Sequence, residues 1–319
     1  MKVLVTGGFG YIGGRLSDAL RGWEGYQVVV HGRRVPPFLE GWVKGLEARL
    51  ADITQPDALR DICEGVDAVV HLASMDENEC VADPMGALEV NVRGTYQVLQ
   101  EALRAGVKQF VYFSTFHVYG PGAGLVYHEG LLPQPLHHYG ITRLMAEQYV
   151  RQAGAGTGMQ TVIVRLSNGF GAPLYPDVDR WTLVFNDLCL RAIRDRKLVL
   201  RSSGLQHRDF IPMGDIVEAV RLLLEAGEGS LVYDVYQVGS GRSVSIRDAA
   251  EIVRGVYQRA YGERLPLEVP DPGPDEVHKP VQFDIGRMKA LGFRPCADWE
   301  EEVHRTLTLC QAHLQEIPA

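Results

Sequence analysis

The stretch "VTGGFGYIGGRL" (residues 5–16) decides the fold of this chain. It follows a strand-like run, "KVLVT" (2–6), and opens a helical pattern. Its glycines read both as G-x-G-x-x-G from Gly8 and as T-G-x-x-G-x-x-G from Thr6 through Gly13. Both readings place small residues where backbone N–H groups and a helix N-terminus can meet a pyrophosphate. We therefore predict a dinucleotide-binding turn; the alternative is that these glycines only tighten a loop.

Short β-rich runs alternate with amphipathic stretches through the first half of the chain. The runs are "KVLVT" (2–6), "QVVVH" (27–31), "DAVVHLA" (67–73), "QFVYFS" (109–114) and "QTVIVRL" (160–166). This alternation predicts a mostly parallel sheet, and continuous Val/Ile runs suit strands that are covered on both faces. The fold class predicted is therefore α/β.

The regular alternation of strands and helices ends after about residue 170, where loops rich in Pro and Gly separate isolated helices and short strands. We predict a dinucleotide-binding domain at 1–170, with strand contributions from about 205–240. A smaller α/β domain at 171–319 is expected to bind mainly substrate. The cleft between the two parts is the expected ligand site.

Composition excludes several classes of protein. The formal net charge is −8 and is spread along the 319 residues, which argues against a nucleic-acid partner. The five cysteines are far apart and form no C-x-x-C pair, a pattern that favours reduced thiols and no metal site. The N-terminus does not resemble a signal peptide, and no apolar run reaches the roughly 18 residues that span a bilayer. We expect a cytoplasmic protein without a membrane partner.

The end of the second strand reports on the cofactor. A carboxylate here binds the adenosine ribose of NAD, whereas arginines accommodate the 2′-phosphate of NADP. This chain has His31, Gly32, Arg33 and Arg34 in that place, which favours NADP over NAD. The alternative is that both arginines are solvated surface charges. At the end of the next strand, Asp52 and Ile53 are expected to meet the adenine.

Polar groups with catalytic potential gather at a strand end and at a helix start. They are Ser114, Thr115 and His117, from "FVYFSTFHVYG" (110–120), and Tyr139 and Arg143, from "HHYGITR" (137–143). The spacing of four places Tyr139 and Arg143 on one helical face. Since a tyrosine has an unperturbed pKa near 10, acting as a base requires adjacent positive charge. Arg143 supplies that charge permanently.

Eight motifs occur in an order that resembles one known family. They are "TGGFGYIGG" (6–14), "HLAS" (71–74), "NVRGT" (91–95), "STFHVYG" (114–120), "YGITR" (139–143), "RLSNGFGAP" (165–173), "QHRDF" (206–210) and "VGSG" (238–241). Together they resemble the extended short-chain dehydrogenase/reductase family, and within it the nucleotide-sugar epimerases, dehydratases and reductases. The resemblance covers nearly the whole chain. It implies a Rossmann-type doubly wound sheet with a smaller C-terminal substrate domain.

The resemblance also implies roles for single residues. Thr115 would hydrogen-bond the reacting sugar oxygen, and Tyr139 would exchange its proton while hydride moves to or from the nicotinamide. Asn91 would support the catalytic helix. Besides Arg33, Arg34, Asp52 and Ile53, the cofactor would contact Gly7, Gly10, Tyr11, Ile12, Gly13, Leu72, Ala73, Ser74, Asn91, Ser114, Tyr139 and Arg143.

Nucleotide-sugar binding is assigned by the same resemblance. Asn168 and Arg208 match positions that hold the diphosphate, while Asn78 lies in a loop that passes over the sugar. For Arg208 the alternative is an ion pair with Asp209 or Asp215.

His117 stands where dehydratases of the family carry a glutamate and some epimerases a cysteine. This chain therefore lacks the glutamate that would act as the base in dehydration. His117 could act as a general acid or base, or it could only pack under the cofactor. His137 and His138, which precede Tyr139 in the sequence, are expected to lie in a loop or to cap a helix.

Arg143 occupies a position that is normally lysine in the family. An arginine can still bind the ribose and favour a phenolate, but it cannot relay protons. This favours epimerisation at C4, which needs no external proton, over reduction of a 4-ketosugar, whereas Arg33 and Arg34 favour an NADPH-dependent reductase. We predict an NAD(P)-dependent nucleotide-sugar 4-epimerase; the alternatives are a 4-ketosugar reductase and a catalytically impaired regulatory protein.

A homodimer is also implied, because family members commonly pair through a four-helix bundle. The apolar residues that would permit it, or that could equally face their own sheet, are Val98, Leu99, Leu103, Leu144 and Val150.

Overall fold

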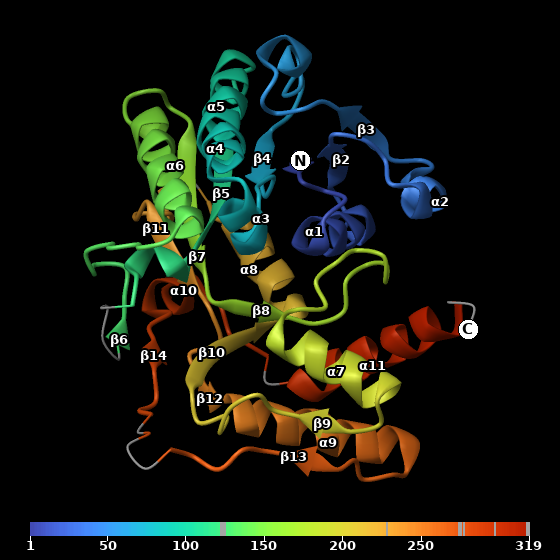
Figure 1. Cartoon of the computed structure of the whole chain (residues 1–319). Coiled ribbons are helices and arrows are strands. Elements are labelled where there is room, and N and C mark those ends of the chain that lie inside the picture. The colour runs from blue at the N-terminus through green and yellow to red at the C-terminus, as the bar shows by residue number, and fades with distance from the viewer. Residues whose placement is uncertain (122–125, 228, 274–275, 277, 297, 317–319) are drawn as a thin grey trace.

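A parallel sheet of seven strands forms the centre of the computed structural model, which describes residues 1–121, 126–227, 229–273, 276, 278–296 and 298–316 (Figure 1). Its order is β11-β7-β5-β4-β1-β2-β3. The strands are β1 (Lys2–Thr6), β2 (Gln27–Gly32), β3 (Glu47–Leu50), β4 (Ala68–His71), β5 (Gln109–Thr115), β7 (Gln160–Leu166) and β11 (Val235–Val238). Every pair within this sheet is parallel. The predicted α/β class and parallel sheet are confirmed.

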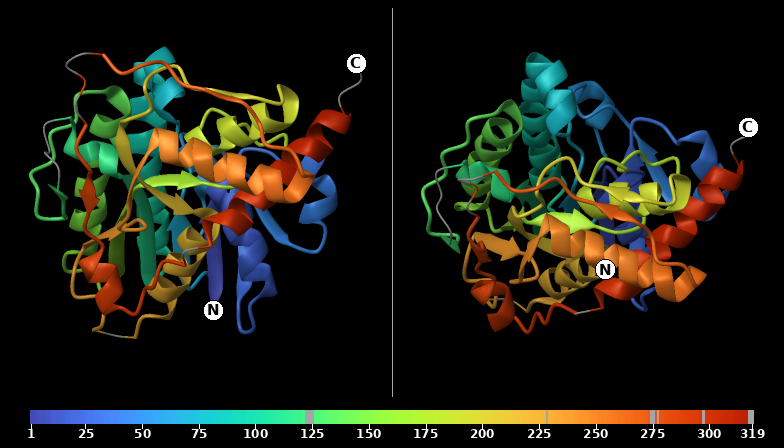
Figure 2. Two further views of the ribbon diagram at one scale, coloured as in Figure 1. Left: turned by 90° about the horizontal axis from the view of Figure 1, so that it is seen from below. Right: turned by 60° about the horizontal axis from the view of Figure 1, so that its bottom comes forward.

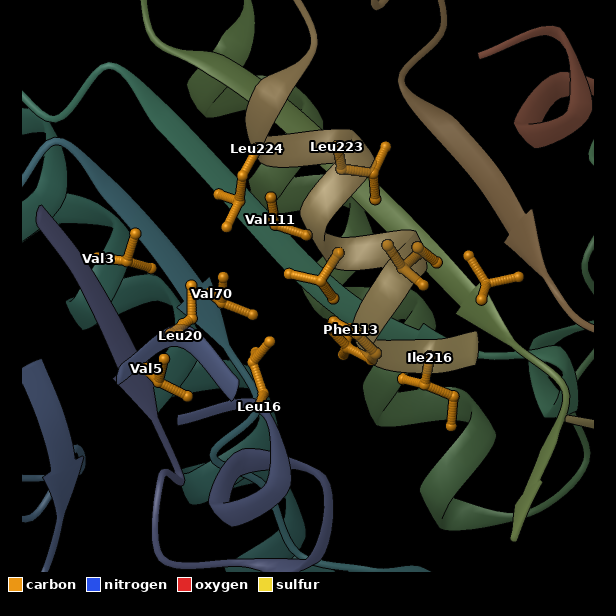
Figure 3. Close-up of a cluster of buried hydrophobic side chains, with 14 of the residues drawn as sticks. Val3, Val5, Leu16, Leu20, Val70, Val111, Phe113, Ile216, Leu223 and Leu224 are labelled. Carbon is orange, nitrogen blue, oxygen red and sulfur yellow. The ribbon is translucent and has the colours of Figure 1, made fainter. Parts of the chain in front are cut away.

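Helices cover both faces of this sheet, which explains the continuous apolar runs of its strands. On one face Val3 and Val5 join the core formed with α1 (Tyr11–Gly22) and α8 (Met213–Glu225), part of which is drawn in Figure 3. On the other face Leu4 and its neighbours pack against α5 (Thr95–Arg104) and α6 (His138–Gly154). Alternate side chains of β1 therefore pack into two separate cores, one on each face of the sheet.

The strands outside the large sheet, most of them in the C-terminal half of the chain, form smaller sheets flanked by helices (Figure 2). The strands are β6 (Val126–Tyr127), β8 (Asn168–Phe170), β9 (Leu198–Val199), β10 (His207–Pro212), β12 (Ser243–Ser245), β13 (Leu267–Glu268) and β14 (Gln282–Phe283). Strands β12, β10 and β8 make one sheet, and a third core lies between it and three helices. These helices are α7 (Val184–Arg194), α9 (Ile246–Tyr261) and α11 (Trp299–Glu316).

Short helices complete the chain. They are η1 (Pro37–Leu39), α2 (Glu40–Val43), η2 (Pro56–Leu59), α3 (Glu77–Ala82), α4 (Pro84–Ala87), the π-helical η3 (Leu88–Gly94), η4 (Phe116–Tyr119) and α10 (Gly286–Ala290). Of the segment expected to add strands to the large sheet, β11 does so, whereas β10 belongs to the smaller sheet.

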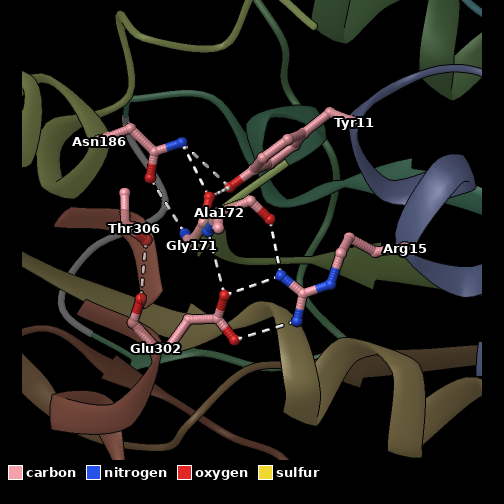
Figure 4. Close-up of polar contacts among 7 residues, drawn as sticks. All are labelled: Tyr11, Arg15, Gly171, Ala172, Asn186, Glu302 and Thr306. Atoms are coloured by element: carbon pink, nitrogen blue, oxygen red, sulfur yellow. Dashed lines mark hydrogen bonds and ion pairs between the residues drawn. The ribbon is translucent and has the colours of Figure 1, made fainter. Parts of the chain in front are cut away.

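A buried polar network ties the C-terminal helix to the glycine-rich turn (Figure 4). Arg15 of α1 donates from Nη1 to Glu302 Oε1 of α11, at 2.9 Å, and to the carbonyl oxygen of Ala172, at 2.6 Å. The Tyr11 hydroxyl donates to the Gly171 carbonyl oxygen, at 2.8 Å. Because Tyr11 and Arg15 both bond to the loop after β8, the N-terminal and C-terminal parts of the chain are held together behind the glycine-rich turn.

The apolar residues expected to permit a dimer face their own sheet. Val98, Leu99 and Val150 are at most 1% exposed and belong to the core between α5, α6 and the large sheet. The alternative in which these three side chains pack against a second chain is therefore wrong, because the sheet already covers them. Leu103 packs against the same core, and Leu144 is half-buried. Among the described residues, no helix is long and apolar enough to cross a membrane.

Candidate active site

A cavity of about 1050 Å³ opens at the carboxyl ends of the large sheet's strands and continues to β8 and β10. It lies where the strand order reverses between β1 and β4, the point at which parallel α/β sheets form ligand crevices. The predicted site residues that line it are Gly7, Gly10, Tyr11, Ile12, Gly13, Arg33, Arg34, Asp52, Ile53, Leu72, Ala73, Ser74, Asn78, Ser114, Thr115, His117, Tyr139, Asn168 and Arg208. Asn91 and Arg143 lie behind the wall.

The glycine-rich turn has no room for side chains. Gly7 has a φ of +67°, and a β-carbon there would lie 2.9 Å from the Ala73 nitrogen. A β-carbon on Gly13 would lie 2.1 Å from the Gly7 carbonyl oxygen, which only glycine avoids. Helix α1 begins immediately after Gly10, its N-cap residue, which provides no side-chain cap. Its first N–H groups therefore face the cavity and suit an anionic pyrophosphate.

Two unpaired cations lie at the end of β2. Arg33 and Arg34 are exposed and line the cavity, and neither forms an ion pair within the described part of the chain. Asp52 accepts hydrogen bonds from the backbone and hydroxyl of Thr54, at 2.9 and 2.8 Å, which lower the pKa of its carboxyl. His31 is buried, and desolvation lowers its pKa to about 4, so its ring is neutral. The net charge of this corner is therefore positive.

Thr115 and Tyr139 meet at the centre of the cavity because β5 ends where α6 begins. The Thr115 hydroxyl accepts from the backbone N–H of His117, at 3.2 Å. Helix α6 starts at His138 and is capped by His137, whose Nδ1 accepts from the backbone N–H of Gly140, at 3.1 Å. The fold thus presents a threonine, a tyrosine and a histidine side by side.

Arg143 lies behind Tyr139 in the protein interior. It is 2% exposed, and its guanidinium carbon lies 5.9 Å from the centre of the Tyr139 ring and 4.7 Å from that of Tyr112. Its Nε and Nη1 have no hydrogen-bond partner among the described residues. A fixed positive charge therefore faces the Tyr139 ring, and donors remain unsatisfied next to the cavity wall.

Asn91 lies behind the wall and joins three segments. Its Oδ1 accepts from the backbone N–H of Met75, at 2.7 Å, and its Nδ2 donates to the Thr142 hydroxyl, at 3.1 Å. Thr142 belongs to α6, so the asparagine links the loop after β4 to the helix that carries Tyr139.

Beneath Ser114 the structure holds a buried ion pair. The Ser114 hydroxyl donates to Glu147 Oε1, at 2.5 Å, and Arg165 Nη2 donates to Glu147 Oε2, at 2.7 Å. Both charged side chains are at most 1% exposed. The Ser114 hydroxyl is thus directed to α6.

At the opposite end of the cavity, Arg208 is exposed and lines the wall. Within the described residues it forms no ion pair with Asp209 or Asp215, so that alternative is wrong. The Asp209 carboxylate instead accepts from the hydroxyls of Ser167 and Ser240, at 2.6 and 3.0 Å. Asn168 Nδ2 donates to the Asp209 carbonyl oxygen, at 2.8 Å, so the side-chain oxygen of Asn168 takes no part in this bond.

Sequence reasoning missed two features of this cavity. Arg180, after β8, forms an ion pair with Asp76, the N-cap residue of α3, and both line the cavity. Glu77, His117 and His137 also come together, with one ligand-type atom from each within 4.8 Å of the others. These three residues are far apart in the sequence, so no local spacing predicts the cluster. The available signal was His137, which lies two residues before Tyr139 and had no catalytic assignment.

Comparisons with known proteins agree with this geometry. The model of the NAD dependent epimerase/dehydratase family matches residues 3–239. The chain belongs to this family. A UDP-glucose 4-epimerase from Azospirillum brasilense is 30% identical over 99% of this chain and 93% of its own length. The resemblance to the extended short-chain dehydrogenase/reductase group is thereby confirmed, and this family member is an enzyme of that type.

Solved structures share the fold. A UDP-glucose 4-epimerase from Thermotoga maritima, solved with UDP-glucose, has a TM-score of 0.82 at 24% identity, covering 98% of this chain and 100% of that one. RMD from Pseudomonas aeruginosa, solved with NADPH, has a TM-score of 0.78 at 25% identity, covering 98% and 99%. Family members with this fold thus include both epimerases and a protein that binds NADPH.

Proposed function

We propose that this protein is an NADP-dependent 4-epimerase of a nucleoside-diphosphate sugar. The observation that carries the proposal is the position of Thr115 and Tyr139 on the cavity floor with Arg143 directly behind the tyrosine ring. The fixed charge of Arg143 faces the Tyr139 ring, and the tyrosine can exchange a proton with the sugar C4 hydroxyl. The Thr115 hydroxyl is placed to hold the same oxygen. Tyr139 then returns its proton when hydride comes back to the other face of C4.

The residues of the cavity fit a dinucleotide. At Gly7 and Gly13 the glycine cradle leaves no room for a β-carbon, so a pyrophosphate can approach the backbone, and two Arg143 donors that no described residue accepts lie behind the cavity wall, where ribose hydroxyls would suit them. When bound, the nicotinamide supplies a reversible hydride acceptor. Arg33 and Arg34 are exposed after β2 and pair with no described carboxylate; they support NADP over NAD because two guanidiniums suit a 2′-phosphate.

Arg208 and Asn168 support a sugar nucleotide as the substrate. The Arg208 guanidinium lines the cavity and pairs with no carboxylate of the described residues, and Asn168 lies on the neighbouring strand β8. A guanidinium fork and an amide are suited to a diphosphate. Asn78, on α3, is exposed and lines the same cavity. The relatives that act on UDP-glucose support this class of substrate.

Arg143 favours epimerisation over reduction of a 4-ketosugar. A guanidinium does not give up its proton, so Arg143 cannot pass protons from solvent to Tyr139. Epimerisation recycles one proton, whereas reduction of a 4-ketosugar consumes one per turnover. The second candidate, a 4-ketosugar reductase, is favoured by Arg33 and Arg34, because exchange of NADPH each cycle suits selection of the phosphorylated cofactor.

The test combines ligand release with one substitution. We expect the purified protein to retain NADP and to interconvert C4 epimers of a nucleotide sugar without added cofactor, measured by mass spectrometry and NMR. Tyr139→Phe should lower kcat by at least about 100-fold while NADP stays bound. Tyr149→Phe, on the same helix, is the matched control and should retain activity.

Three other outcomes would each lead to a different conclusion about the protein. Strict dependence on added NADPH with a ketosugar would establish the reductase. Retained cofactor with no C4 activity across a panel of nucleotide sugars would favour the regulatory alternative. Full activity of Tyr139→Phe would contradict the assignment of the tyrosine.

We also propose a homodimer through the outer surface of α5 and α6. Tyr96 and Tyr149 are each 41% exposed there, with their rings edge to face at 5.2 Å between centroids. Other exposed apolar side chains on α3, α4 and α6 are Val81, Met85, Ile141 and Met145. A clustered apolar surface of this kind suits a protein partner, and a second copy presents the same surface.

A further inference from the structure

Three side chains from separate parts of the chain meet beside Tyr139. Glu77 begins α3, His117 lies in η4 after β5, and His137 caps α6. One carboxylate oxygen and one nitrogen of each ring lie within 4.8 Å of one another. The centres of the two histidine rings are 5.2 Å apart. The His117 ring lies edge to face with the Tyr139 ring, at 6.1 Å between centroids, so the two side chains are neighbours in the cavity wall.

This cluster connects the cavity with solvent. Glu77 is exposed and lines the cavity, and its carboxylate has no hydrogen bond to another described residue. His117 also lines the cavity but is half-buried. Burial lowers the pKa of His117 to about 4; the charge of Glu77 raises it, while those of His137 and Arg208 lower it. His117 is therefore neutral at pH 7, with one nitrogen that accepts and one that donates.

The proton of His137 has a defined place. Its Nδ1 accepts from the Gly140 backbone N–H, so the neutral ring carries its proton on Nε2. Two histidines and a glutamate are also a zinc ligand set. A metal here would compete with the helix cap or require the protonated nitrogen as a ligand. The geometry therefore favours proton exchange over metal binding.

Other titratable groups near Tyr139 are closed off. Arg143 keeps its proton. Glu147 is fully buried and held by Arg165 and Ser114. Both ring nitrogens of the buried His71 are hydrogen-bonded, to the hydroxyls of Thr6 and Thr95. His138, beside Tyr139 in the chain, is exposed but does not line the cavity, whereas Glu77 is exposed and lines it together with His117.

We propose that Glu77, His117 and His137 form a proton relay between Tyr139 and solvent, replacing the route that Arg143 cannot provide. The relay rests on the proposed C4 hydride chemistry. When a C4 ketone is reduced, hydride goes to carbon and Tyr139 gives its proton to oxygen. His117 protonates the phenolate from one ring nitrogen, and its other nitrogen takes a proton from a water that the Glu77 carboxylate and His137 hold, so that solvent supplies one proton per turnover. Oxidation of the alcohol runs the same steps in reverse, releasing one proton for each hydride.

This relay makes the protein competent in both C4 reactions. Epimerisation does not depend on it, because Tyr139 recovers the proton that it lends. Reduction of an added 4-ketosugar depends on it at every turnover. The two reactions therefore separate a defect in proton supply from a defect in hydride transfer or binding.

The experiment compares Glu77→Gln with Glu79→Gln. Both remove one carboxylate from α3, and a glutamine at 79 preserves the capping box that Glu79 forms with Asp76. Two rates are measured for each variant: reduction of a nucleotide 4-ketosugar with excess NADPH, and C4 epimerisation of the corresponding nucleotide sugar. His137→Asn, which keeps an N-cap acceptor but removes the ring, is the second variant.

We expect Glu77→Gln to lower kcat for ketosugar reduction by about 10-fold or more, with little change in KM or in epimerisation. Added imidazole should restore the rate by carrying protons from solvent to the exposed side of the cluster. His137→Asn should lose the same reaction, and Glu79→Gln neither.

Several results would overturn the relay. They are equal losses in both reactions, a change confined to KM, no rescue by imidazole, and a wild-type enzyme that epimerises but cannot reduce the ketosugar. Zinc bound stoichiometrically through Glu77 would show a metal site instead. All of these leave the epimerase standing; absence of any C4 chemistry in the wild-type protein would overturn the proposed function and the relay together.

Discussion

Glu147→Gln tests how the helix that carries Tyr139 is held on the sheet. Glu147 and Arg165 are 0% and 1% exposed, and Arg165 donates to both carboxylate oxygens, from Nε at 3.0 Å and from Nη2 at 2.7 Å. Ser114 donates to the same carboxylate. A glutamine replaces one accepting oxygen with an NH₂ group that faces other donors. It also leaves the charge of Arg165 buried without a counter-ion.

The expected cost follows from this complete burial. Removing one partner of a buried ion pair destabilises a protein by about 3–5 kcal/mol, which is more than about 100-fold in the unfolding constant. Urea unfolding followed by tryptophan fluorescence and far-UV circular dichroism measures it. Glu218→Gln, in the partly exposed pair with Arg221, is the control and should cost about 0–1 kcal/mol.

A double variant separates lost charge pairing from lost packing. In Glu147→Leu with Arg165→Met, no buried charge remains, so the loss should be clearly smaller than in Glu147→Gln. The reasoning is refuted if Glu147→Gln costs less than about 1 kcal/mol, or if the double variant is at least as unstable as the single one.

Three further outcomes are expected. Gly13→Ala should abolish NADP binding in calorimetry because its β-carbon would meet the Gly7 carbonyl at 2.1 Å, whereas Gly41→Ala, with no atom within 4 Å, should bind as wild type; equal binding would contradict the cradle. Burial raises the pKa of Asp215 to about 6, so the folded state holds a proton that the unfolded chain releases near pH 4, and stability should fall as pH rises from about 4 to 6. Asp215→Asn should remove that fall in urea unfolding at several pH values; an unchanged pH profile would exclude Asp215 as its source. Tyr149→Arg should yield monomers in light scattering, and a persistent dimer would place the interface elsewhere.

The sequence predicted the fold through local rules. The glycine-rich turn between a strand and a helix required a cradle without β-carbons, and Gly7 and Gly13 occupy it. The β/α alternation indicated a parallel sheet, since apolar runs such as that of β7 need cover on both faces. The last strand, β11, follows a long excursion through the C-terminal part, so its place at the sheet edge depended on tertiary packing.

Much of the candidate site was also predictable, because carboxyl ends of parallel strands converge on one edge. Thr115, Tyr139, Asn168 and Arg208 all line one cavity. The position of Arg143 was predictable only in part: its helical spacing placed it near Tyr139, while its burial against Tyr112 came from the packing of α6 on β5. Packing likewise decided that Val98, Leu99 and Val150 face the sheet and not a second chain.

The sequence by itself thus predicted the β/α alternation, the parallel sheet after the glycine-rich turn and the candidate catalytic residues, because these depend on periodicity and on residues near one another in the chain. Only the tertiary structure brought Glu77 and His137 to His117, and Arg180 to Asp76. Such contacts join segments separated by tens of residues, and their distances are set by how helices pack on the sheet. No local pattern encodes them.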